Sequence, residues 1–132
     1  MKTFLFPTFA LVLLAAPLQA EERHHAALGT GHFDNDTDFV SEGIATHLGP
    51  FDEVGSVQFG DTSDPTAIPI TGWAIHTAAN GDQLFETVSG TLSGLAGAGT
   101  ATMTYVGGTG RFADASGTAD FSLQLLGEGT FE

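Results

Sequence analysis

The sequence contains no cysteine and very few basic residues. Three Lys and Arg residues face sixteen Asp and Glu residues, which gives a formal charge of −13 at pH 7. Without cysteine the chain forms no disulfide and carries no lipid-modified cysteine. So acidic a surface repels phosphate backbones and anionic headgroups, so neither nucleic acid nor anionic lipid is an expected partner. An acidic surface of this kind is also typical of a protein exposed to salt.

Several sequence patterns are missing as well. After residue 20, no apolar helical period persists for three turns. There is no phosphate-binding loop, dinucleotide fingerprint, zinc-ligand spacing or hydrolase elbow. The sequence therefore predicts a domain without α-helices and indicates no cofactor.

The N-terminus has the pattern of a secretory signal peptide, expected to be helical. Lys2 precedes an apolar run over 4–16, and small residues stand before Glu21. This run falls short of the ~20 residues that span a bilayer, so no stable membrane anchor is expected. We predict cleavage near Ala20 and a secreted or periplasmic protein. The mature chain then carries 2 − 16 = −14 charges.

The rest of the chain shows the alternation of polar and apolar residues that is typical of half-buried strands. Residues 21–38 look polar and irregular, and residues 39–132 are expected to form the folded domain. Apolar side chains alternate clearly at Met103 and Tyr105 in one strand and at Phe121 in another. We predict strands over 39–48, 54–59, 70–79, 83–92, 100–106 and 118–125, with a last short one near 129–132. Glycines at strand ends favour closure into an all-β barrel.

Asn80-Gly81 is the strongest hairpin signal in the chain. If these two residues form the turn, Ile75 lies opposite Glu86. Trp73 and Glu86 then share one face, whereas His76 and Phe85 share the other. If the face of Glu86 is the interior, burial would raise its pKa and suit it to proton transfer. If the face of His76 is the interior, Glu86 lies in solvent.

A second glycine-rich turn runs over residues 106–117. Its expected structural residues are Gly107, Gly108, Gly110, Arg111, Phe112 and Gly117. We expect one helical turn here, with Phe112 tucked under the end of the sheet. Arg111 is expected to pair with Asp114 or with a carbonyl at a strand end.

Three motifs together resemble a known family. They are Ala45-Thr-His-Leu-Gly-Pro-Phe51, Ala78-Ala-Asn-Gly-Asp-Gln-Leu84 and Gly107-Gly-Thr-Gly-Arg-Phe-Ala-Asp-Ala-Ser-Gly117. Over most of 39–125 the chain resembles small secreted bacterial proteins of the allene-oxide-cyclase-like group, which are related in shape to dirigent proteins. The resemblance implies a closed antiparallel barrel of about eight strands with an apolar interior, often oligomeric. Enzymes of this group steer ring closure or coupling of an apolar substrate inside the barrel.

The candidate site residues follow from these patterns. Glu86 is the candidate catalytic acid. The candidate ligand-binding residues are Trp73, His76, Phe85, Met103, Tyr105 and Phe121, and core packing is the alternative for the last three. Asp34, Asp36 and Asp38 alternate as in calcium loops but lack the glycine and glutamate of an EF-hand, so a solvated acidic loop is the alternative. His47 has no companion at a diagnostic spacing, and His24-His25 follow the cleavage site.

Three functions remain open at this point. The first is a non-catalytic barrel that binds a small apolar molecule or a protein partner. The second is a cofactor-free cyclase or isomerase that acts on an apolar substrate with Glu86. The third is a structural extracellular protein. A homo-oligomer is compatible with each of them.

Overall fold

The structure is a computed structural model that describes residues 26–127 and 130–131, and these fold almost entirely into antiparallel strands. The strands are β1 (Ala27–Phe33), β2 (Asp38–Ala45), β3 (Gly49–Phe59), β4 (Ile68–Ala78), β5 (Gln83–Ser93), β6 (Ala98–Gly108), β7 (Gly117–Gly127) and β8 (Thr130–Phe131). Within the described residues, the only helical element is the single 3-10 turn η1 (Gly110–Phe112). The predicted all-β antiparallel class is confirmed.

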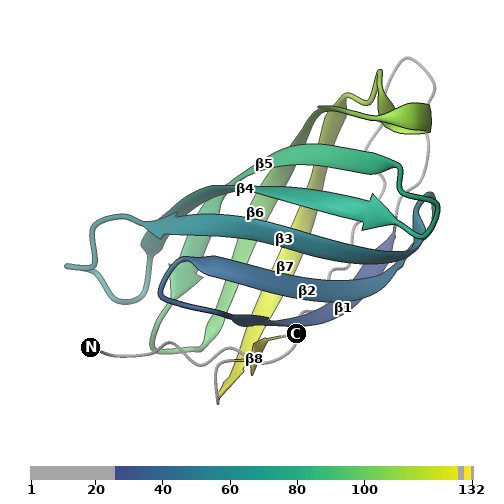
Figure 1. Cartoon of the computed structure of the whole chain (residues 1–132). Helices are drawn as coiled ribbons and strands as arrows, with labels where there is room; N and C mark the ends of the chain where they lie inside the picture. The colour runs from purple at the N-terminus through teal and green to yellow at the C-terminus, as the bar shows by residue number, and fades with distance from the viewer. Residues whose placement is uncertain (1–25, 128–129, 132) are drawn as a thin grey trace.

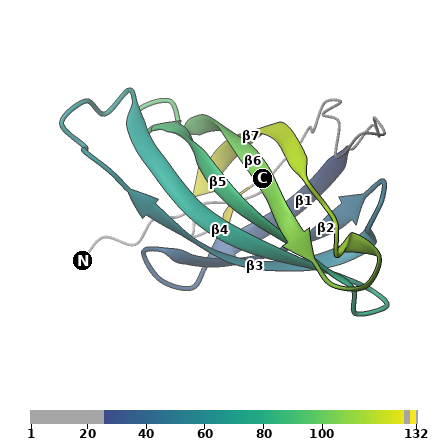
Figure 2. The same ribbon diagram turned by 90° about the horizontal axis from the view of Figure 1, so that it is seen from above.

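The strands pair in chain order, and the sheet curls strongly into a barrel-like shape (Figures 1 and 2). Each ladder from β1 to β7 joins at least seven residue pairs. The two-residue strand β8 pairs with β7 on one side and with β1 on the other, through two residue pairs each. The sheet is therefore held most weakly along β8. Across the described ranges, no helix is long and apolar enough to cross a membrane.

Alternate residues of each strand form the buried side of the curled sheet, which we call the inner face. Met103 and Tyr105 of β6 and Phe121 of β7 are buried there, as the alternation predicts. Six alanines line this face among sixteen buried apolar residues, so much of the inner wall consists of small side chains. The outer face alternates with it and carries exposed acidic residues such as Glu42 and Asp52.

Three strand assignments differ clearly from those predicted. Strand β2 ends at Ala45 and not at residue 48, because residues 46–48 form the turn. Strand β1 lies within residues 21–38, so the irregular structure predicted there is wrong for Ala27–Phe33. Its glycines and polar residues hid the alternation. Strand β3 begins at Gly49 and not at residue 54, because the turn lies before Gly49-Pro50 and Gly49 takes a left-handed φ of 70°. The predicted signal peptide and His24-His25 lie outside the described residues.

The register predicted for the β4–β5 hairpin is wrong by one residue. The loop has three residues, Ala79 to Gly81, because Ala78 N donates to Asp82 O at 2.8 Å and Gly81 N donates to Ala78 O at 2.9 Å. Gly81 has a φ of 92°, which only glycine adopts freely, and the Asn80 side chain accepts a hydrogen bond from Asp82 N. Such a three-residue loop is the next commonest after the two-residue turn. Because side chains alternate between the two faces of a strand, this extra residue places His76 on the same face as Glu86 and Trp73 on the same face as Phe85.

The turn between β6 and β7 matches its prediction in most respects. Phe112 is partly buried and packs against the core, and Gly107, Gly110 and Gly117 take left-handed φ angles. A Cβ at Gly108 would lie 2.1 Å from the Gln83 carbonyl oxygen, so this glycine permits close backbone approach. Arg111 does bind carbonyls, but those of the turn before β3, since Nη2 donates to His47 O at 3.2 Å. Its acidic neighbour is Asp82, at 3.8 Å, and not Asp114.

Candidate functional site

A row of polar side chains crosses the inner face of five neighbouring strands. Its residues, which we call the interior polar row, are Ser41 of β2, Glu53 of β3, His76 of β4, Glu86 of β5 and Tyr105 of β6. The register places them side by side, because Ser41 pairs with Glu53, Glu53 pairs with His76, and Glu86 pairs with Tyr105. All five are buried, with at most 7 % of each residue exposed. Three ionisable groups and a phenol therefore meet within an apolar core.

The imidazole of His76 lies between two carboxylates. His76 Nδ1 is 2.7 Å from Glu86 Oε1, and His76 Nε2 is 3.3 Å from Glu53 Oε2. Glu53 in turn accepts a hydrogen bond on Oε1 from the Ser41 hydroxyl. The ring of Phe51 packs edge-on against the imidazole, with 4.6 Å between ring centroids. This arrangement holds the imidazole in one orientation with a carboxylate at each nitrogen.

The surroundings favour a protonated imidazole. Burial alone lowers the pKa of His76, but the charges of Glu86 and Glu53 outweigh it and raise that pKa to about 9. Burial and the charge of Glu86 raise the pKa of Glu53, although His76 acts in the opposite direction. Burial, followed by the charges of Glu86 and Glu53, raises the pKa of Tyr105.

Glu86 is the least satisfied member of the interior polar row. Its side chain has no exposed surface, and its Oε2 has no hydrogen-bond partner within residues 26–127 and 130–131. A β-bulge between β5 and β6 falls beside it, where Phe85 pairs with Gly107 and Glu86 with Tyr105. Bulges re-aim side chains, and they are common next to active sites. A buried acceptor without a partner is costly unless something else donates to it.

The same three ionisable residues form the one group in the described chain that could hold a metal ion. Glu53, His76 and Glu86 each offer a ligand atom, and these atoms lie within 4.8 Å of one another. However, each imidazole nitrogen faces a different carboxylate, and an imidazole binds one ion through one nitrogen. A shared ion would require the imidazole or a carboxylate to turn. The observed geometry fits a shared proton better than a metal.

The structure brings together several of the residues predicted from the sequence. Glu86 and His76 share the inner face and touch, although the predicted hairpin register separated them. Tyr105 pairs with Glu86, and Met103 is the next inner-face residue of β6. Phe121 lies in the same core from β7.

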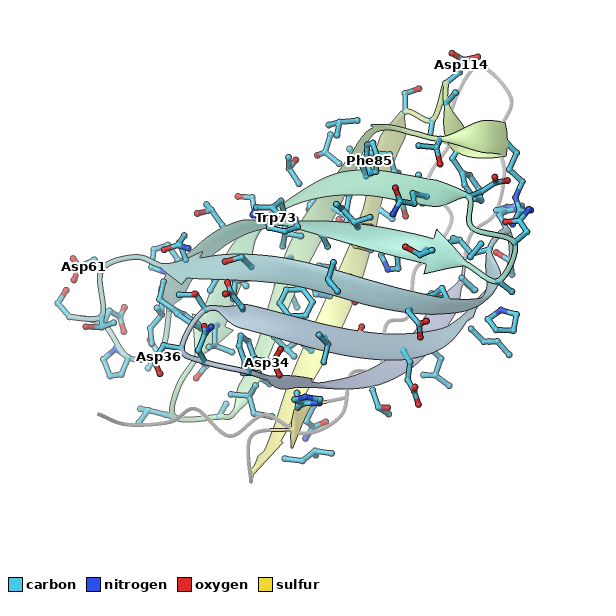
Figure 3. The ribbon with its side chains drawn as sticks, viewed as in Figure 1. Asp34, Asp36, Asp61, Trp73, Phe85 and Asp114 are labelled. Carbon is cyan, nitrogen blue, oxygen red and sulfur yellow. The ribbon has the colours of Figure 1, made fainter. Side chains whose placement is uncertain are left out.

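Two of the predicted ligand-binding residues lie on the other side of the sheet. Trp73 is 48 % exposed, and Phe85 alternates with the buried Leu84 and Glu86 (Figure 3). Trp73 therefore does not share a face with Glu86, and Phe85 does not share one with His76. Both predictions were wrong because the loop at Asn80-Gly81 is one residue longer than expected. His47 lies in the turn before β3, away from the interior polar row.

Sequence reasoning missed Glu53 and Ser41. The signal was present, because Glu53 stands at the same parity as Phe51, Val57 and Phe59 in β3. It was overlooked because the strand was predicted to begin at residue 54. Ser41 similarly stands at the same parity as the buried Phe39 in β2. A charged residue at an inward position of a strand is a strong sign of a buried polar cluster.

The predicted calcium ligands lie around the turn between β1 and β2, where Figure 3 labels Asp34 and Asp36. Within the described chain they do not form a metal-ligating group. Asp38 instead accepts a hydrogen bond from Asn35 Nδ2 at 3.0 Å, and Asp34 lies 3.1 Å from His32. These contacts are typical of a self-capped acidic turn.

The outer face carries an apolar row that crosses four strands. Val40 pairs with Val54, Val54 with Ile75, and Ile75 with Phe85. Val54 is 47 % exposed. Trp73 nearby and Ile44 farther along β2 are also exposed. An open groove of about 710 Å³ over β1 to β3 is lined in part by Val40 and Val54 of this row. We call Val40, Val54, Ile75 and Phe85 the outer apolar row.

Comparison of the chain with protein-family models, curated proteins and solved structures finds no match. The resemblance to the allene-oxide-cyclase-like group therefore rests on the three sequence motifs alone. The interior polar row is the structural feature from which a function is argued.

Proposed function

We propose that this protein is a secreted or periplasmic barrel that takes up a small apolar molecule and acts on it as a cofactor-free isomerase or cyclase. Glu86 is the proton acceptor and donor, and the barrel closes through β8. The observation that carries the proposal is the buried cluster of Glu53, His76 and Glu86. The pKa values of Glu53 and His76 are both raised in this cluster, and buried groups with perturbed pKa values gather at functional sites.

The energetic cost of the cluster supports a functional role. Moving an ion into the interior costs several kcal/mol even after relaxation, and well-packed apolar residues are often at least as stable as a buried ion pair. The inner face is otherwise largely apolar. A chain selected for stability alone would gain little from placing Glu53, His76 and Glu86 there. Fold specificity is the competing explanation.

Each residue of the cluster has a distinct role in the proposed chemistry. Glu86 takes a proton from a carbon of the substrate and returns it to another position. The two carboxylates favour the protonated form of His76. The imidazolium holds Glu86 in place and stabilises its charge. Glu53 is a positioning residue, since it touches His76 Nε2 and is itself fixed by Ser41. Residues of the inner wall fold the substrate.

Access to the interior requires the sheet to open, because Glu86 is closed to solvent. Strand β8 is the natural place, since it is held by two residue pairs on each side and every other ladder has at least seven. Local opening involves the elements with the fewest contacts. An apolar molecule would therefore enter along β8.

The test uses 5-nitrobenzisoxazole, an apolar probe of buried carboxylate bases. The base removes the ring C–H proton, that electron pair forms the C≡N bond, and the N–O bond breaks to give a coloured phenolate. We expect the mature protein to exceed Glu86→Gln by about a hundredfold in rate. Glu42→Gln, which makes the same charge change on the exposed side of β2, is the matched control.

Equal rates for the wild type and Glu86→Gln would remove Glu86 as a base. Folding of each variant is checked by circular dichroism, so that a lost rate is not mistaken for unfolding. A rate lost equally in Glu42→Gln would assign the effect to surface charge.

The outer apolar row favours a second candidate function, binding of a protein partner or of another copy of the chain. Exposed apolar patches of this kind mark interaction sites. Sedimentation velocity of the mature protein and of Val54→Lys tests it. A monomer that is unaffected by the substitution would argue against self-association through this row.

A further inference from the structure

We propose that the interior polar row selects apolar molecules whose polar group donates a hydrogen bond or is positively charged, and that it rejects carboxylates. This inference rests on the interior binding proposed above and names the class of ligand. An apolar alcohol or amine fits it, whereas a fatty acid does not.

The first step concerns the acidic and basic side chains of the interior. The carboxyl groups of Glu53 and Glu86 are buried on the inner face, and His76 is the one basic side chain that touches both of them. Arg111 is the only Lys or Arg within residues 26–127 and 130–131, and it lies at the end of the sheet, bound to carbonyls and near Asp82. A bound carboxylate would therefore have His76 as its only buried cation, and both nitrogens of His76 already face carboxylates.

The second step is the unpaired oxygen of Glu86. Glu86 Oε2 is buried and lacks a hydrogen-bond partner within the described residues, so it requires a donor. A hydroxyl or ammonium group supplies one, but a carboxylate supplies only acceptors and adds like charge. In a low-dielectric interior, charge repulsion is much stronger than in water.

The third step concerns the side chains against which the apolar part of the ligand would pack. Ala74 pairs directly with Glu86 across β4 and β5, and Ala101 and Ala119 lie on the inner face of β6 and β7. Met103 is the flexible neighbour, being fully buried and one inner-face position from Tyr105. Methionine adapts readily to a changed packing environment. A ligand that reaches Glu86 would displace the Met103 side chain.

Met103 also provides the reporter. The chain has two methionines, and removal of the signal peptide leaves Met103 alone. Mature protein labelled with ¹³C at the methionine methyl therefore gives one signal from the core. We would titrate it with decan-1-ol, decylamine and decanoate at pH 7, each as a monomeric solution. We expect the alcohol and the amine to shift this signal and to bind at least roughly tenfold more tightly than decanoate.

Two variants assign the selectivity to its source. Glu86→Gln removes a carboxyl group next to the ligand. In this variant decanoate should bind at most about threefold more weakly than the alcohol and the amine. Glu42→Gln removes one charge from the outer face and should leave the discrimination unchanged. If Glu86→Gln does not fold, the wild-type titrations still decide the selectivity.

The outcomes separate this inference from the proposed function. Decanoate that binds as tightly as decylamine would overturn the selectivity and leave interior binding intact. A Met103 signal that none of the three molecules moves would overturn interior binding, and the selectivity with it. Discrimination that persists in Glu86→Gln would assign it to the surface charge and refute the role of Glu86.

Discussion

Loss of the proton from His76 should make the protein less stable as the pH rises above neutrality. The folded protein raises the pKa of this histidine from 6.5 to about 9, through Glu86 and Glu53 and against the effect of burial. A group whose pKa is raised on folding stabilises the folded state fully below its unfolded pKa. That stabilisation is lost as the pH rises through the folded value. The loss should therefore fall between pH 6.5 and 9.

The size of the effect follows from the two pKa values. The difference is 9 − 6.5 = 2.5 units, which corresponds to about 3 kcal/mol of unfolding free energy. The carboxyl of Glu53 acts in the same direction, because its pKa is also raised. Its contribution begins to decrease above the unfolded value of 4.5. Since a domain of this size has a stability of ~5–15 kcal/mol, the loss is readily measured.

The assay is urea unfolding at a series of pH values, followed by the fluorescence of Trp73, the only tryptophan of the chain. The His76 ring signals in NMR spectra report the titration directly. His32→Gln is the control, because His32 lies exposed on β1 and its removal should leave the loss of stability in place. A wild-type unfolding free energy that stays constant or rises from pH 6.5 to 9 would refute the reasoning.

Three further predictions concern the interior and the frame around it. Tyr105, the only tyrosine, has a pKa raised by burial and by two nearby carboxylates, so its phenolate absorbance should be absent at pH 10 and appear on unfolding; ionisation of the folded protein near pH 10 would contradict this. Gly72→Ala places a Cβ 2.1 Å from the Ser56 carbonyl oxygen and should destabilise by about 3 kcal/mol in thermal unfolding, whereas Gly94→Ala, with its nearest atom at 3.5 Å, should cost much less. Arg111→Met removes two hydrogen bonds to carbonyls of the turn before β3 and should lower stability by about 1 kcal/mol without changing ligand binding in the Met103 assay; altered binding would instead give Arg111 a role in the site.

Much of the fold follows from the sequence alone. Alternation over β6 and β7 correctly places Met103, Tyr105 and Phe121 on the inner face, because a strand with one buried side has to repeat with period two. Glycine placement identifies the turn before β7, since its left-handed backbone angles are strained for other residues. These are local constraints, so a single sequence carries them.

Only the tertiary structure decided which polar residues meet. The loop at Asn80-Gly81 has three residues and not the two that were predicted, so His76 lies on the face of Glu86. No local rule distinguishes the two loop lengths there. Glu53 joins them through the pairing of β3 with β4, across a long loop. The site is assembled from three strands whose register is set by the packing of the whole inner face. For that reason its residues could be proposed from the sequence one by one, but their contact could not.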